Sequence, residues 1–171
     1  MKTINLKKAL FAFALTAFVG FAAIAQEKAS PAKKAEGTVA GAKVTISYSS
    51  PAVKGRTIWG DLVPLGQVWR AGADDATTFT TTKDITVQGQ KLAAGTYSFF
   101  IIPGETESTF IFNKVSKQWG AFNYDAKEDE LRVSVPSQQS SNLEERLVYE
   151  VTADGFEIRW EYAKAAAKIG A

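Results

Sequence analysis

The sequence predicts an all-β fold: a single-domain antiparallel β-sandwich or partly open barrel of about eight or nine strands. Apolar and polar residues alternate with a period of two in many short runs, as at Val44, Ile46 and Tyr48. Clusters of Gly, Pro, Asn and Asp separate these runs and act as turn signals. A chain of 171 residues has room for one domain.

Residues 1–25 have the composition of a secretory signal peptide. Three lysines precede an apolar run over residues 9–24, and residues 23–25 (Ala-Ile-Ala) form a small-x-small cleavage motif. Cleavage after Ala25 predicts a periplasmic or secreted protein with no membrane span. The alternative is an uncleaved membrane anchor, but the apolar run is slightly short for a span of about 20 residues.

Removing this segment changes the charge balance of the chain. The signal holds three of the 20 basic residues and none of the 18 acidic ones, so the mature chain has 17 basic against 18 acidic residues. Without a basic excess, we expect no nucleic-acid partner.

The chain contains no cysteine and no histidine. This composition excludes a Ser-His-Asp or Cys-His nucleophile and a His-ligated zinc site. We predict no cofactor, and the remaining catalytic options are carboxylates, lysine, tyrosine and oxygen-ligated metals. The domain must also be stable without disulfides.

The two ends of the mature chain are predicted to lie outside the domain. Residues 26–37 (QEKASPAKKAEG) have no large apolar side chain, so we expect a flexible linker. Residues 163–171 (AKAAAKIGA) are too short for a stable isolated helix, so we expect a frayed tail. A β-sandwich-like domain then covers residues 38–162.

Several runs inside the domain are predicted strands. They cover residues 77–82, 95–102, 109–113, 119–124 and 131–135. The run 95–102 is apolar on both faces, so we expect a central strand. A two-residue turn at Gln88-Gly89 would pair Ile85 with Leu92. A helical turn is an option at residues 142–147.

The last predicted hairpin has a register that the sequence specifies. With Asp154-Gly155 as a type I′ turn, Tyr149 opposes Trp160 on one face. Glu150 then opposes Arg159 on the other face. Because a slip of one residue would reverse both faces, we predict this register.

Four segments of the chain carry a resemblance. They are GRTIWGDLVPLGQVWRAGADDATT (55–78), KLAAGTYSFFIIPG (91–104), FNKVSKQWGAFNYD (112–125) and LRVSV (131–135). In this order they resemble the secreted bacterial domain-of-unknown-function family 2911, over residues 45–162. The resemblance implies an exported β-rich domain and implies no reaction or ligand. The chain departs from the family pattern at Asp74-Asp75, where an Asn-Glu pair is usual.

The irregular stretch 55–78 supplies the first candidate ligand-binding residues: Trp59, Asp61, Trp69 and Arg70. Tryptophan faces stack on apolar ring surfaces, Asp accepts hydrogen bonds and Arg binds carboxylates in a forked geometry. The structural alternative is that Asp61 caps a turn, Trp69 belongs to the core and Arg70 pairs with an acid.

Three further candidate ligand-binding residues are Asp75, Asn123 and Asp125. Asn123 and Asp125 would lie on one face of the predicted strand 119–124, and that strand could line a groove with the first stretch. Asp74-Asp75 with Asp61 or Asp125 could bind calcium, but the EF-hand spacing is absent, so we predict no metal site.

These observations predict an exported, non-catalytic binding domain of the cell envelope. The expected ligand is a glycan, a peptide or another envelope protein, and we expect a monomer. One alternative is a hydrolase that uses Asp61 with Asp125 or Asp75, which would need two acids across a cleft. The other alternative is a structural envelope component without a small ligand. No catalytic residue is assigned.

Overall fold

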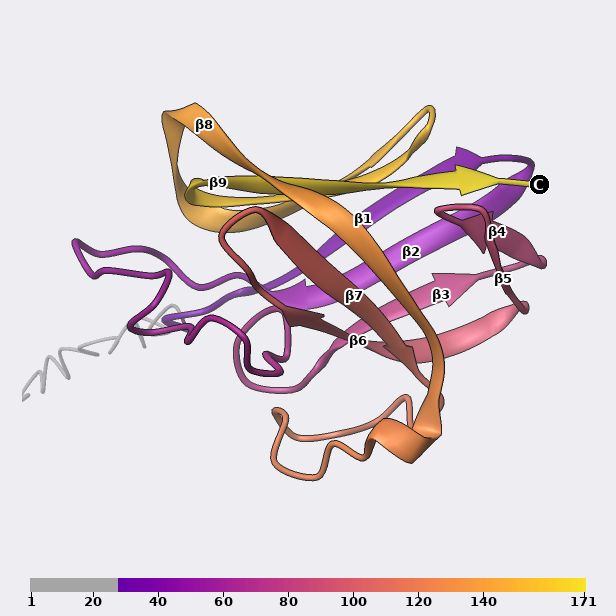
Figure 1. Cartoon of the computed structure of the whole chain (residues 1–171), viewed down its shortest axis with the longest axis horizontal. Helices are drawn as coiled ribbons and strands as arrows, with labels where there is room; N and C mark the ends of the chain where they lie inside the picture. Colours follow the sequence, from indigo (N-terminus) through magenta and orange to yellow (C-terminus); the bar gives the residue numbers. More distant parts are fainter. Residues whose placement is uncertain (1–27) are drawn as a thin grey trace, which may run out of the picture.

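The computed structural model describes residues 28–171, and its fold is all β, as predicted. Nine strands form one antiparallel sheet that is not closed, in the order β1-β2-β3-β6-β7-β8-β9-β4-β5 (Figure 1). The strands are β1 (Ala32–Val39), β2 (Ala42–Ser49), β3 (Thr77–Thr81), β4 (Ile85–Val87), β5 (Gln90–Leu92), β6 (Gly95–Ile102), β7 (Glu107–Asn113), β8 (Asp129–Thr152) and β9 (Gly155–Gly170), with a 3-10 helix η1 (Ala126–Glu128). The predicted signal peptide lies outside the described residues.

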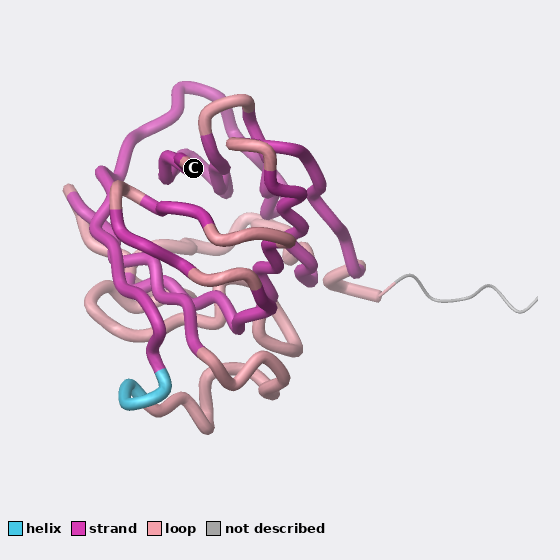
Figure 2. Tube along the Cα trace, turned by 90° about the vertical axis from the view of Figure 1, so that its right-hand side faces the viewer, coloured by secondary structure: helices cyan, strands magenta, loops and turns pink. Residues whose placement is uncertain are grey.

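The long strands β8 and β9 carry the sheet around the core. The first part of β8 pairs with β7, and its later part pairs with β9. The β8–β9 register shifts on both sides of Glu144, which marks bulges that bend the pair. As a result the strands curve around a common interior (Figure 2).

Alternating side chains of the sheet fill this interior. Ala42, Val44, Ile46 and Tyr48 of β2 are buried, while the residues between them are more accessible. Their period of two is the pattern that predicted the strand. Other strands contribute phenylalanines to the same core, namely Phe79, Phe99, Phe110, Phe112 and Phe156.

Strand β6 is buried on both faces, which confirms its predicted central position. Phe99 faces the main core, whereas Phe100 belongs to a separate small cluster with Ala76 and Ile111. The irregular segments of the chain cover this second cluster, since Tyr124 packs against it. Irregular loops therefore bury the outer face of the central strand.

The prediction of a flexible linker is wrong from residue 32 onward. Residues 32–39 form β1, which pairs with β2 along its whole length. Most β1 side chains are exposed, so the strand is held by main-chain hydrogen bonds rather than by apolar burial. β1 also packs closely against Val151 of β8, since a Cβ on Gly37 would lie 2.7 Å from Val151 Cγ1.

The prediction of a frayed tail is also wrong. β9 continues to Gly170, and Ala165, Ala167 and Ile169 are buried in alternation. Ile169 is the register partner of Val87 in β4.

The last hairpin keeps its predicted faces but not its predicted register. The turn is Ala153-Asp154, and Thr152 opposes Gly155. Tyr149 therefore opposes Ile158 rather than Trp160. A shift of two residues preserves the side-chain faces, so burial alone could not distinguish the two registers.

Three other local predictions have different outcomes. The turn at Gln88-Gly89 is confirmed, with φ values of 51° and 79° and with Ile85 opposite Leu92. The predicted strand 119–124 is wrong, because Trp119 forms one isolated bridge and a turn follows it. The optional helical turn at residues 142–147 is replaced by strand β8.

Candidate functional site

The stretch 55–78 is joined to β6 next to the point where β3 begins. Trp69 exchanges two main-chain hydrogen bonds with Ile101, at 2.8 and 2.9 Å. Gly66 N–H donates to the Pro103 carbonyl at 2.8 Å. This short pairing continues the sheet beyond β3 and fixes the position of Trp69.

Two buried hydrogen bonds to the Ala71 carbonyl hold the next part of the stretch. The Ala71 carbonyl accepts from Tyr149 Oη at 2.7 Å and from Thr77 Oγ1 at 2.9 Å. Gly72 follows in a confined position, where a Cβ would lie 2.9 Å from Thr77 Oγ1. The hydroxyl of Tyr149 thereby ties β8 to the irregular stretch, and burial raises its pKa well above the usual value.

Three tryptophans form the centre of the candidate site. Trp69 stacks on Trp160 with ring centroids 5.8 Å apart, and Trp59 meets both rings edge to face at 5.7 and 6.0 Å. Trp69 Nε1 donates to the Gly72 carbonyl at 3.2 Å. The nitrogen atoms of Trp59 and Trp160 are buried without a hydrogen-bond partner among the described residues.

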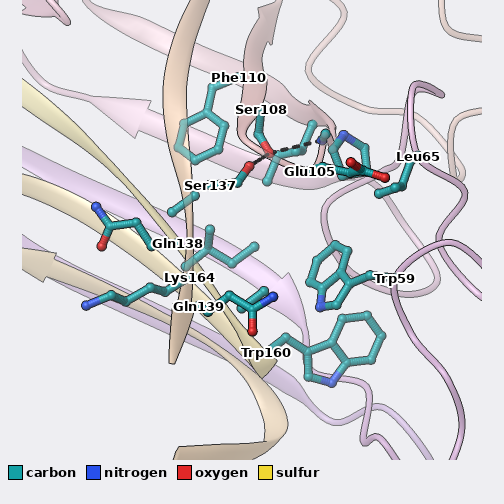
Figure 3. A pocket seen from close by; sticks show the side chains of 16 residues that line it. Trp59, Leu65, Glu105, Ser108, Phe110, Ser137, Gln138, Gln139, Trp160 and Lys164 are labelled. Atoms are coloured by element: carbon teal, nitrogen blue, oxygen red, sulfur yellow. Dashed lines mark hydrogen bonds between the residues drawn. The ribbon is translucent and has the colours of Figure 1, made fainter. Parts of the chain in front are cut away.

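The first pocket has a volume of about 370 Å³ and lies between β6–β7, β8 and β9 (Figure 3). Its inner wall is apolar and contains Trp59, Ile101, Phe110, Ile158 and Trp160. In Figure 3 the two indoles lie on one side of the pocket and Phe110 on the other. A volume in the range of about 300–1,000 Å³ with an apolar wall is typical of small-molecule sites.

Polar groups of the first pocket lie mostly at its rim. Glu105, Gln138 and Gln139 are exposed, and Lys164 is half-buried. The serine hydroxyls deeper in the wall are already engaged, because Ser108 Oγ and Ser137 Oγ lie 2.8 Å apart. The pocket therefore offers apolar contact inside and hydrogen bonds at its mouth.

The second pocket has a volume of about 330 Å³ and is lined by two of the three tryptophans. Trp160 lines both pockets, while Trp69 lines only this one. Three cationic residues line the second pocket: Lys54, Arg56 and Arg70.

The predicted site residues separate into two groups. Trp59 lines the first pocket, and Trp69 and Arg70 line the second. Trp69 is 9% exposed, so most of it belongs to the core, as the structural alternative expected. The expectation that Arg70 pairs with an acid is wrong, since no ion pair of Arg70 occurs among residues 28–171.

The other four predicted residues line neither pocket. Asp61 is exposed in the turn between Trp59 and Val63. Asn123 is exposed in the turn before η1, and Asp125 caps η1 through a 2.9 Å hydrogen bond from Lys127 N–H. These positions provide turn structure rather than a shared cleft.

The stretch 55–78 and the segment 119–125 (WGAFNYD), which the sequence suggested could share a groove, meet in space. Asp75 forms an isolated bridge with Trp119, and Gly120 N–H donates to the Asp74 carbonyl at 3.2 Å. Asp74 has a φ of 58°, a backbone conformation that Asp and Asn tolerate better than most residues. This contact leaves Trp119 60% exposed and Phe122 82% exposed.

A polar cluster anchors the loop that carries these aromatics. Tyr124 Oη donates to Asp129 Oδ2 at 2.6 Å, and Arg132 Nε donates to the same oxygen at 2.6 Å. Burial, and then the hydrogen bond and charge of Asp129, raise the pKa of Tyr124 to about 12. Tyr124 also packs edge to face on Phe100 at 5.0 Å.

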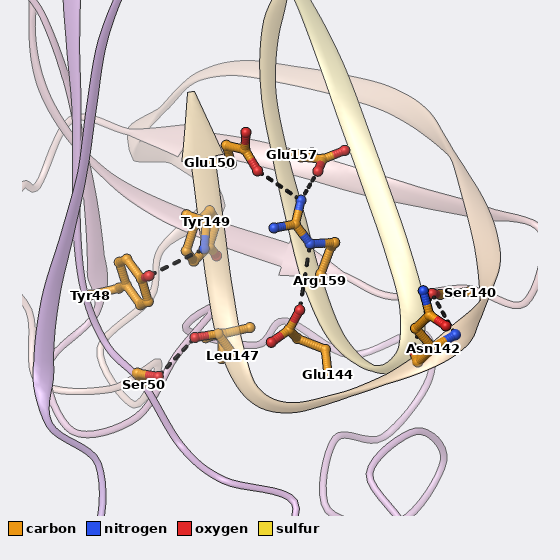
Figure 4. A network of polar contacts seen from close by, with 10 residues as sticks. All are labelled: Tyr48, Ser50, Ser140, Asn142, Glu144, Leu147, Tyr149, Glu150, Glu157 and Arg159. Atoms are coloured by element: carbon orange, nitrogen blue, oxygen red, sulfur yellow. Dashed lines mark hydrogen bonds and ion pairs between the residues drawn. The ribbon is translucent and has the colours of Figure 1, made fainter. Parts of the chain in front are cut away.

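A second polar cluster holds the β8–β9 hairpin (Figure 4). The Arg159 guanidinium lies between the carboxylates of Glu144, Glu150 and Glu157. The predicted pairing of Glu150 with Arg159 therefore exists as an ion pair, at 3.0 Å, although the register partner of Glu150 is Glu157. The cluster stabilises the hairpin that presents Trp160.

Sequence reasoning missed most of the first pocket. Its walls come from β6, β7, β8 and β9, which are distant in sequence and meet only in the folded sheet. Ala163, Lys164 and Ala165 belong to the segment that was predicted to fray. The alternation of Ala165, Ala167 and Ile169 was the signal that could have revealed this strand.

Within residues 28–171, no group of three or more acidic side chains is placed to hold a metal ion. Among the same residues, no helix has the length and apolarity needed to cross a membrane.

Comparison with known proteins identifies the family of the chain. A search of curated proteins and a search of solved structures each give no significant match. The family described as "Protein of unknown function (DUF2911)" matches residues 30–169, which include β1 and nearly all of β9. The chain therefore belongs to the DUF2911 family.

Proposed function

We propose that this protein is an exported, non-catalytic binding domain of the cell envelope whose first pocket takes a small apolar or amphipathic molecule. The observation that carries this proposal is the apolar wall of the pocket beneath a polar rim. The signal-like sequence of residues 1–25 supports export.

The lining favours an apolar ligand over a glycan. A sugar requires several hydrogen bonds to its hydroxyls, but Ile101, Phe110 and Ile158 offer none from their side chains. The indole nitrogens of Trp59 and Trp160 are buried away from solvent. Apolar contact therefore supplies the binding free energy, at about 25 cal/mol per Å² of buried apolar surface.

The rim provides a place for a polar end of the ligand. Lys164 and Glu105 carry opposite charges at the mouth, with Gln138 and Gln139 nearby. An amphipathic molecule could bury its apolar part and keep its polar end in water, so burial of polar groups would not oppose binding.

The hydrolase alternative has less support. Asp61, Asp75 and Asp125 are exposed and line neither pocket. A carboxylate pair needs a shared cleft in which both acids face the substrate.

A titration with N-phenyl-1-naphthylamine, a neutral apolar fluorophore, tests the proposal. The fluorescence should rise and saturate at one equivalent. Leu65 lies at the pocket and is 37% exposed, so Leu65→Ala should weaken binding about threefold to tenfold by removing apolar contact.

Leu143→Ala is the matched control, because Leu143 is 50% exposed and lies outside both pockets. It should leave probe binding unchanged. Absence of saturable binding, or equal losses in the two variants, would reject the first pocket as a ligand site.

A further inference from the structure

We propose that the second pocket is an independent site for a small organic anion. The carboxylate or phosphate of the ligand would face Lys54, Arg56 and Arg70, and its apolar body would lie against Trp69 and Trp160. This inference does not require the first pocket to be occupied.

The first support is a concentration of cations without counter-ions. Within the described part of the chain, Lys54, Arg56 and Arg70 take part in no ion pair. By contrast, Arg132 pairs with one carboxylate and Arg159 with three. Lys54, Arg56 and Arg70 are brought together because all three line one pocket of about 330 Å³.

The second support is the state of Arg70. Its Nε is buried and has no hydrogen-bond partner among residues 28–171. A buried, unpartnered donor on a charged group is unfavourable, and an anion bound to the same guanidinium would offset that cost. The Arg70 side chain passes close to Gly120, since a Cβ on Gly120 would lie 3.9 Å from Arg70 Cδ.

The third support is that Arg56 is held in position before any ligand binds. Its Nε donates to the Val53 carbonyl at 3.0 Å and its Nη2 to the Ala52 carbonyl at 2.5 Å. These bonds orient the guanidinium and leave Nη1 for another acceptor. A preorganised cation loses little conformational entropy when an anion binds.

An acid adjoining the pocket does not neutralise these cations. Glu145 Oε1 accepts from the main-chain N–H of Lys54 at 2.9 Å, so its carboxylate is directed at the backbone. No ion pair joins Glu145 to a cation within residues 28–171. The positive charge of the pocket is therefore available to a ligand.

The apolar part of the pocket selects organic anions over inorganic ones. The stacked Trp69 and Trp160 line the pocket together with Leu62, which is 45% exposed. Aromatic faces bind planar apolar groups, so a ligand with both a ring and an acid would use both parts of the pocket.

Calorimetric titrations of the whole protein with benzoate, phenyl phosphate and benzamide test the proposal. Benzoate or phenyl phosphate should bind saturably, and neutral benzamide should bind at least about tenfold more weakly. Raising the salt concentration should weaken binding of the anion but not of benzamide.

Four variants locate the site. Arg70→Gln should weaken binding of the anion about tenfold or more, and Lys54→Gln about twofold. Lys91→Gln is the charge-matched control, since Lys91 is exposed on β5 outside the pocket, and it should have no effect. Leu65→Ala should also have no effect, which separates this site from the first pocket.

Several outcomes would overturn the proposal. They are absence of saturable binding by both anions, equal affinity for benzoate and benzamide, and an effect of Lys91→Gln as large as that of Lys54→Gln. If Arg70→Gln fails to fold, the exposed Lys54 variant and the benzamide comparison still decide the question.

Discussion

Trp69 and Trp160 stack with their ring centroids 5.8 Å apart, and Trp160 lies on the walls of both pockets. One residue comes from the irregular stretch 55–78 and the other from β9. The pair therefore joins the irregular stretch to β9, and Trp160 borders both an apolar pocket and a cationic one. Its loss should affect both stability and binding.

Trp160→Ala should lower the free energy of unfolding by about 3–5 kcal/mol, because it removes a large buried ring and leaves a cavity. The side chain is 1% exposed. Trp119→Ala, at a side chain that is 60% exposed, is the matched control and should change stability by less than about 0.5 kcal/mol. Denaturant unfolding measures both, and equal effects would contradict the assigned core.

Tyr149→Phe should destabilise the protein by about 1 kcal/mol, because the Ala71 carbonyl loses one of its two donors. The loss stays modest since Thr77 Oγ1 still donates to that carbonyl. Tyr162→Phe, at a residue 49% exposed, is the control and should be neutral. A Tyr149→Phe variant as stable as the wild type would show that the bond to Ala71 has no net effect.

Ile169→Ala should destabilise the protein by about 2–4 kcal/mol, since Ile169 is buried against the core at the end of β9. Lys168→Ala, at the exposed neighbouring position, should change little. If both variants unfold like the wild type, residues 163–171 form a frayed tail and the strand assignment fails.

Tyr124 should make stability depend on pH in the alkaline range. Its pKa is raised in the folded state to about 12 from a usual value of 10.0, so its contribution is complete below about pH 10. The contribution is lost as the pH rises through about 12, because the unfolded state releases the proton first.

Tyr124→Phe removes this titrating group. The difference in unfolding free energy between the wild type and Tyr124→Phe should therefore shrink as the pH rises from about 9 to about 12. Tyr48, Tyr97 and Tyr149 also have raised pKa values, so the variant should keep part of the alkaline loss. A constant difference across this range would contradict the assigned pKa.

Local alternation predicted the strands that bury one face. Ile46 and Val133 lie on such faces, and their neighbours identify the strand without knowledge of its partners. β1 was missed because its side chains stay exposed and its hydrogen bonds depend on β2. The hairpin register was missed by two residues because Tyr149 and Trp160 are buried in either register.

The candidate site was only partly predictable for a related reason. Trp59, Trp69 and Arg70 are rare residue types within one irregular stretch, so composition alone drew attention to them. Phe110 and Ser137 are unremarkable in sequence and become pocket residues only when β7 and β8 meet β9. Sequence patterns identify side chains with unusual chemistry more readily than they identify an enclosed volume.

The indole N–H signals of the four tryptophans provide the most direct test of the central claim, the apolar ligand site. In a ¹⁵N-labelled sample titrated with N-phenyl-1-naphthylamine, the signals of Trp59 and Trp160 should shift and saturate together. The signal of Trp119, which lies outside both pockets, should stay in place. Shifts confined to Trp119, or no shift at Trp59 and Trp160 at saturation, would contradict the proposed function.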